Sequence, residues 1–141
     1  MRVDFYEMKG RYTDPLFVAA VLSGRAWPSC GRLAIVGGPE QLDQLDERLW
    51  HEPKGRFLPH IRIRSGQQPD STADRTIVLS EQSPDHSDVL INLVPEGALP
   101  AGQFTRVLEI VPQDETLKQA LRQRWSDWKQ RGADLHHHVL K

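Results

Sequence analysis

The sequence predicts a single α/β domain that spans residues 1–141, and two observations carry this prediction. The first is a strand followed by a helix: residues 32–36 form a continuous apolar run, and the helical pattern of residues 39–50 begins soon after it. A strand that is apolar on both faces is typical of a parallel sheet covered by helices. The second is size, because 141 residues with 38% hydrophobic side chains suit one domain of ordinary dimensions. We find no internal repeat and no domain boundary.

Two other elements precede this apolar run. Residues 3–6 form a short β-prone segment. Asp14 is a candidate N-cap with Pro15 at the first helical position, and the helix that follows is expected to end at Gly24. In the helix of residues 39–50, one apolar stripe combines Leu42, Leu45, Leu49 and Trp50.

The second half of the chain begins irregularly. Residues 52–60 contain two prolines and a glycine, and residues 65–73 form a polar, turn-rich loop. A helix is expected from an N-cap at Asp114 to Arg131, and residues 135–141 are interpreted as a solvated or partly packed tail. Before that helix, three β-prone segments are predicted as strands: residues 76–79, 89–94 and 106–111.

Composition excludes several classes of protein. The 18 basic and 19 acidic residues give a net charge of −1, so the chain lacks the overall positive field that drives non-specific nucleic-acid binding. The single cysteine, Cys30, cannot form an intramolecular disulfide and suits a reducing compartment. No apolar run reaches the ~20 residues of a membrane span, and the N-terminus lacks a signal core. We therefore expect a soluble, cytoplasmic domain.

No catalytic, metal or cofactor site is apparent in the sequence. Gly37 and Gly38 follow a strand and precede a helix, but the third glycine of a dinucleotide-binding loop is missing, so a structural turn is the favoured interpretation over a nucleotide site. The histidines at 136–138 lack cysteine or carboxylate partners at ligand spacing. The other histidines lack a paired nucleophile. We expect no cofactor.

The last helix carries most of the local positive charge. Its apolar stripe of Leu117, Leu121 and Trp128 is expected to face the core. A basic ridge lies about 100° around the helix and suits an acidic peptide, a carboxylate or single-stranded nucleic acid; the alternative is a solvated face with Trp125 merely half-buried. The ridge consists of Lys118, Arg122, Trp125 and Lys129. The charge count of this helix also includes Arg124 and Arg131 against Asp127.

Trp50 and Phe57 flank a loop with little regular structure to cover them. Large aromatic side chains in such a position are frequent anchors of protein–protein interfaces. The alternative is that both rings pack against the sheet as part of the core.

These two regions carry a family resemblance. The run LDERLWHEPKGRFLPH at residues 45–60, then DVLINL at residues 88–93, and EIVPQDETLKQALRQRW at residues 109–125 resemble the chi subunit of bacterial DNA polymerase III. The similarity covers most of the chain but is poor over residues 13–31. It implies a single three-layer, Rossmann-like domain with a mostly parallel central sheet and no working nucleotide site.

The resemblance also implies an adaptor rather than a catalyst. Chi subunits are non-catalytic accessory subunits of the polymerase holoenzyme. They pair with the psi subunit, which connects them to the clamp loader. Another face binds the acidic, phenylalanine-ending C-terminal tail of the single-stranded-DNA-binding protein, so contact with DNA is mainly indirect.

Site residues follow from the matching positions. The tail site is expected at Val111, Lys118, Arg122 and Trp125, and the psi contact at Trp50 and Phe57. Some family members have tyrosine at the position of Trp125 and a basic residue at that of Ser126, so the chain departs from them there.

Two other functions stay open. One is a small Rossmann-like nucleotide-binding enzyme, which saturable binding of ATP or NAD would favour. The other is a direct binder of single-stranded nucleic acid through the last helix, which tight binding to a naked oligonucleotide would favour.

Overall fold

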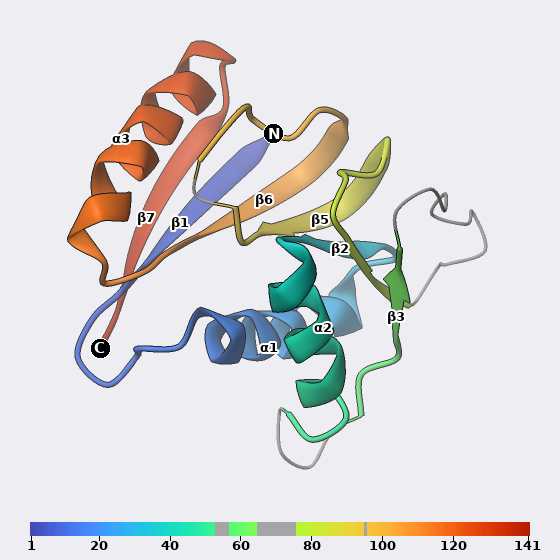
Figure 1. The fold of residues 1–141 in the computed structure, drawn as a ribbon. Coiled ribbons are helices and arrows are strands. Elements are labelled where there is room, and N and C mark those ends of the chain that lie inside the picture. Colours follow the sequence, from blue (N-terminus) through green and yellow to red (C-terminus); the bar gives the residue numbers. More distant parts are fainter. Residues whose placement is uncertain (53–56, 65–75, 95) are drawn as a thin grey trace.

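The computed structural model describes residues 1–52, 57–64, 76–94 and 96–141. One sheet of seven strands, all parallel, runs through the centre in the order β3-β4-β2-β5-β6-β1-β7 (Figure 1). The strands are β1 (Arg2–Met8), β2 (Leu33–Val36), β3 (His60–Ile63), β4 (Ile77–Ser80), β5 (His86–Asn92), β6 (Gln103–Val111) and β7 (Asp134–Leu140). The helices are α1 (Pro15–Ala26), α2 (Pro39–Arg48) and α3 (Glu115–Gln130), with a 3-10 turn at Trp27–Ser29.

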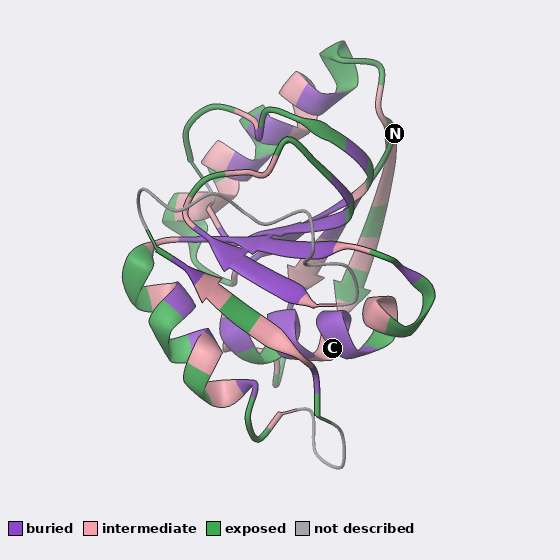
Figure 2. Cartoon of the chain, turned by 90° about the vertical axis from the view of Figure 1, so that its right-hand side faces the viewer, coloured by how far each residue is buried: buried purple, intermediate pink, exposed green. Residues whose placement is uncertain are grey.

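Helices cover both faces of the sheet, which confirms the three-layer α/β prediction. α1 and α2 lie on one face and α3 on the other, with the buried strands between them (Figure 2). Successive side chains of a strand point to opposite faces. In β2, Leu33 and Ile35 therefore join the core under α1 and α2, whereas Ala34 and Val36 join the core under α3.

The first two helices agree with the sequence at their starts but not at their ends. The Asp14 carboxylate accepts a hydrogen bond from the Leu16 amide at 3.0 Å, as an N-cap does. α1 continues past Gly24, which is buried inside it, to Ala26. α2 ends earlier than expected, because the Trp50 amide bonds to the Glu47 carbonyl three residues back at 3.3 Å and so tightens the chain into a turn.

Both edge strands escaped the sequence analysis. β3 begins at His60, the last residue of the segment interpreted as irregular, and continues beyond it. The interpretation of residues 135–141 as a tail is wrong, because β7 pairs with β1 along its whole length. Edge strands are half exposed, so polar residues fill them and the apolar signal of a strand is lost. The expected loop at residues 65–73 lies outside the described residues.

Gly102 fits a position that no other residue fits well. Its φ is +132°, and an added Cβ would lie 2.7 Å from the Pro84 carbonyl oxygen and 2.9 Å from that of Asp85. We expect Gly102→Ala to lower the free energy of unfolding by roughly 1–3 kcal/mol, measured by denaturant titration. Gly97→Ala is the matched control, because Gly97 also has a positive φ (+95°) but its added Cβ would meet nothing within 4 Å. Equal losses in the two variants would contradict a steric role for Gly102.

Candidate functional site

A pocket of about 300 Å³ lies between α3 and the strands β1, β6 and β7. All four residues that the sequence assigned to a tail-binding site line it: Val111, Lys118, Arg122 and Trp125. We call this cavity the α3 pocket. Its other lining residues are Phe5, Glu7, Leu121 and His137.

The floor and one wall of the α3 pocket are apolar. The rings of Phe5 and Trp125 pack with their centroids 5.0 Å apart and their planes inclined by 52°. Val111 and Leu121 are buried beside them, and Trp125 is half-buried. The pocket thus offers an aromatic and aliphatic surface that a hydrophobic side chain can contact.

Positive charge lies at the rim. Arg122 is exposed, and it forms no hydrogen bond or ion pair with the described part of the chain. Lys118 is partly buried and pairs with Glu115 of the same helix, Nζ to Oε1 at 2.8 Å. A free guanidinium beside an apolar floor suits a ligand that carries a carboxylate next to a hydrophobic group.

Two strand residues in the pocket were missed by the sequence analysis. Glu7 and His137 face each other across β1 and β7, Oε2 to Nε2 at 3.5 Å. Burial alone would raise the pKa of Glu7, but Lys9 and His137 lower it overall. The Glu7 carboxylate therefore stays ionised in the pocket. Alternation along β1 places Phe5 and Glu7 on one face, but His137 needs β7 to be recognised as a strand.

The basic ridge of α3 is shorter than its sequence suggests. Lys129 is exposed but does not line the α3 pocket. Arg124, counted among the basic residues of this helix, is buried, with its Nε 3.5 Å from Oε2 of Glu109. Its charge is therefore directed into the core and adds little to the surface.

The Arg124 partner is a buried carboxylate on β6. Glu109 accepts a hydrogen bond from Asn92 Nδ2 at 2.7 Å. Burial raises the pKa of Glu109 to about 7, although Arg124 and Asn92 oppose that shift. A carboxyl group with a raised pKa binds its proton more tightly in the folded chain than in the unfolded chain.

This raised pKa predicts a pH dependence of stability. Between pH 5 and 8 the folded chain loses the Glu109 proton that the unfolded chain has already lost, so Glu109 contributes less to stability as the pH rises. We measure the unfolding free energy of Glu109→Gln relative to that of the unmodified chain. We expect this difference to rise in favour of the variant by about 1–3 kcal/mol between pH 5 and pH 8. Asn92→Ala is a control that keeps the carboxyl group and therefore keeps a pH slope. Parallel stability curves for Glu109→Gln and the unmodified chain would contradict this prediction.

The second predicted site is an exposed pair of aromatic rings. Trp50 is 59% exposed and Phe57 is 56% exposed, so the interpretation of these residues as core is wrong, and Trp50 departs from the apolar stripe of α2. Their centroids lie 5.3 Å apart. His60 packs edge-on against Trp50 at 5.2 Å, and its ring nitrogens bond to the carbonyls of Leu58 and Asp46. The chain thus holds two large apolar side chains at its surface, which we call the aromatic pair.

The glycine turn after β2 is occupied by the chain itself. The Gly38 amide donates to Oε1 of Gln41 at 3.0 Å, and a Cβ on Gly37 would lie 3.3 Å from Leu93. The Gly38 amide, which a bound phosphate would contact, already donates to Gln41. This supports the interpretation of residues 37–38 as a structural turn.

The three histidines of β7 alternate between the two faces of the sheet. His138 bonds to Asp4, Nε2 to Oδ1 at 2.7 Å, whereas His137 faces Glu7 on the other face. Within the described residues, no cluster of three or more histidine, cysteine or acidic residues is suited to hold a metal ion. None of the described helices is long and apolar enough to span a membrane.

Comparisons with known proteins give the family. The family model described as DNA polymerase III chi subunit, HolC, matches residues 1–136. The chain is 33% identical to the DNA polymerase III subunit chi of Pseudomonas aeruginosa, over 99% of this chain and 96% of that protein. It is 33% identical to the Escherichia coli K12 subunit, over 81% and 78% of the two chains, and 30% identical to that of Haemophilus influenzae, over 84% and 82%. Because the family model and the Pseudomonas aeruginosa relative both match nearly the whole length, the chain belongs to the family of DNA polymerase III chi subunits.

Proposed function

We propose that this replication accessory subunit is a non-catalytic adaptor. It joins the psi subunit, and through psi the clamp loader, to the C-terminal tail of the single-stranded-DNA-binding protein, in the cytoplasm of a bacterium. The α3 pocket carries this proposal, because a free arginine at the rim of an apolar cavity matches a peptide that ends in phenylalanine and carries acidic residues.

Each part of the α3 pocket has a partner in such a tail. Arg122 donates two parallel hydrogen bonds to the terminal carboxylate. Lys118 attracts the acidic side chains that precede it, at the cost of its pairing with Glu115. Trp125 and Val111, together with Phe5, enclose the phenylalanine ring.

The aromatic pair serves the psi subunit in this proposal. Exposed tryptophan and phenylalanine side chains are costly in water unless a partner covers them. The pair follows α2, on the face of the sheet opposite α3, so the two partners approach different sides of the domain (Figure 1). One molecule of the chain can therefore hold both partners at once.

Simultaneous binding is the direct test of an adaptor. Psi is fixed to a resin and incubated with intact single-stranded-DNA-binding protein, with or without the chain. We expect the resin to retain the single-stranded-DNA-binding protein only when the chain is present and only when the C-terminal tail of that binding protein is intact. Competition between psi and the binding protein for the chain would contradict the proposal, as would ATP hydrolysis that copurifies with the chain.

A further inference from the structure

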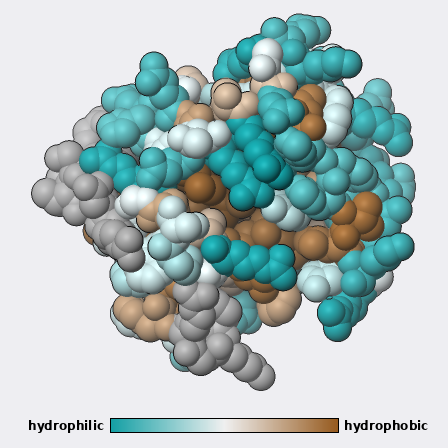
Figure 3. Space-filling view, turned by 180° about the vertical axis from the view of Figure 1, so that it is seen from behind, coloured by the Kyte–Doolittle hydropathy of each residue, from teal (hydrophilic) through white to brown (hydrophobic). Residues whose placement is uncertain are grey.

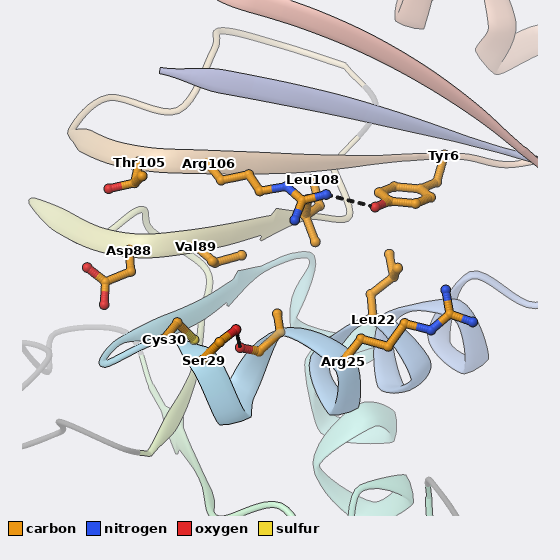
Figure 4. A pocket seen from close by; sticks show the side chains of 11 residues that line it. Tyr6, Leu22, Arg25, Ser29, Cys30, Asp88, Val89, Thr105, Arg106 and Leu108 are labelled. Carbon is orange, nitrogen blue, oxygen red and sulfur yellow. Dashed lines mark hydrogen bonds between the residues drawn. The ribbon is translucent and has the colours of Figure 1, made fainter.

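A second cavity lies on the other face of the sheet from the α3 pocket. It has a volume of about 450 Å³ and opens between the C-terminal end of α1 and the strands β5 and β6 (Figure 4). Its floor is apolar and is formed by Leu22, Cys30, Val89 and Leu108. Seen from behind, the molecule has apolar surface near its centre between strongly hydrophilic side chains (Figure 3). The volume suits a small molecule or one residue of a polymer.

One end of this cavity is positively charged. Arg106 lines it from the sheet and Arg25 from α1, so the two arginines lie on opposite sides of the cavity, both away from Asp88 (Figure 4). Arg106 is held in place, because its Nε donates to the buried Asp4 carboxylate at 2.7 Å and its Nη2 to the Tyr6 hydroxyl at 3.0 Å. Its Nη1 has no hydrogen-bond partner in the part of the chain that the structure describes. Arg25 is exposed and has no acidic partner there either.

The other end presents hydrogen-bond acceptors. Asp88 lies there beside Ser29, away from the two arginines (Figure 4). One Asp88 oxygen, Oδ2, accepts the amides of Gly31 and Arg32 at 2.7 and 2.9 Å, which fixes the carboxylate in place. The other oxygen, Oδ1, accepts no hydrogen bond from the described residues and can accept one from a ligand.

We propose that this cavity binds a nucleotide unit, with its phosphate between Arg25 and Arg106 and its base on the apolar floor. A phosphate carries the charge that two guanidinium groups bind best, and a base supplies a flat apolar surface. Amino or hydroxyl groups at the far end of the nucleotide donate to Asp88. An acidic peptide fits less well, because Asp88 repels a second carboxylate.

This site is distinct from the two interpreted from the sequence. It lies on the opposite face of the sheet from the basic ridge of α3, and it does not include the glycine turn at residues 37–38. The source of the nucleotide unit is either a free mononucleotide or a single-stranded nucleic acid.

Nuclear magnetic resonance titration of the full ¹⁵N-labelled chain tests the proposal. The probes are deoxycytidine 5′-monophosphate, deoxycytidine without phosphate, and a five-residue deoxycytidylate. We expect the monophosphate to shift the amide signals of Val89 and Leu108, with about tenfold weaker binding of the nucleoside. Tighter binding of the oligonucleotide identifies a strand as the source, and equal binding identifies the mononucleotide.

Arg25→Gln is the decisive variant, because Arg25 is exposed and its loss leaves the fold intact. We expect it to weaken binding about tenfold, whereas Arg11→Gln, at an exposed arginine outside the cavity, leaves binding unchanged. Arg106→Gln would be harder to interpret, because it also removes the ion pair of Arg106 with the buried Asp4 and so changes the fold around the cavity. The proposal is overturned if the cavity signals stay fixed at millimolar nucleotide. It is also overturned if Arg25→Gln binds as the unmodified chain does, or if an acidic peptide shifts these signals as strongly.

Discussion

Replacing Arg122 by alanine should remove most of the binding of a synthetic peptide with the acidic, phenylalanine-ending sequence of the single-stranded-DNA-binding protein tail. Charge-assisted hydrogen bonds to a carboxylate contribute about 1.5–3 kcal/mol when shielded from water, which corresponds to roughly a tenfold to hundredfold loss of affinity. Arg122 is exposed in the free chain, and in the proposed complex the terminal residue of the peptide covers it. Calorimetry at low salt measures the loss.

Two comparisons show whether the effect is specific to the α3 pocket. Lys129→Ala is the matched control, because Lys129 is a basic residue of the same helix that lies outside the pocket. It should change affinity little, and Lys118→Ala should have an intermediate effect, since a surface charge facing flexible acidic residues is screened. Amidation of the peptide C-terminus should weaken binding to the unmodified chain but scarcely to Arg122→Ala. Equal affinity of the unmodified chain and Arg122→Ala would refute the site.

Alanine at Trp50 or Phe57 should abolish copurification with psi and leave the domain folded. Truncation of a central aromatic anchor typically costs about 2 kcal/mol or more, roughly a thirtyfold loss of affinity. Both rings are more than half exposed, so their removal takes little packing from the core. Affinity for psi and the melting temperature of each variant are measured together.

Phe17→Ala is the control for the aromatic pair. Phe17 is an exposed aromatic residue of α1 at 42% exposure, and it is not one of the two rings of the aromatic pair. Its replacement should leave psi binding unchanged. If Trp50→Ala and Phe57→Ala instead lose several degrees of thermal stability, the rings support the fold and the proposed interface is wrong.

The sequence predicted the interior of the sheet better than its edges. β2 and its neighbours are buried on both faces, so hydrophobicity alone identifies them. β3 and β7 lie at the edges: His60 and Arg62 interrupt the apolar residues of β3, and the three histidines of β7 are partly exposed, so neither segment has the apolar pattern of a buried strand. Helix starts were predicted closely because a cap such as Asp14 is a local signal, whereas the end of α2 depends on how the chain turns after Arg48.

Part of the candidate site was also predicted, because the spacing of residues along one helix is a local signal. Helical spacing places Lys118, Arg122 and Trp125 on one face, and this arrangement is present. Spacing alone cannot show that Phe5 stacks on Trp125, because that contact depends on which strand lies under the helix. Nor can it separate Arg124, which is on the same helix, from the exposed arginines; the buried carboxylate of Glu109 decides its direction.

The position of β1 has a consequence for how the protein is made. This strand is synthesised first, yet its two neighbours in the sheet begin only at Gln103 and Asp134. While the ribosome is still translating the middle of the chain, β1 has no sheet partner, and long-range pairing of this kind is slow. The α3 pocket contains residues from β1, β6, α3 and β7, so it is completed only after β7 has been synthesised. Under the proposed function, a nascent or truncated chain that lacks β7 therefore cannot bind the tail of the single-stranded-DNA-binding protein, and only chains that contain β7 are recruited through it.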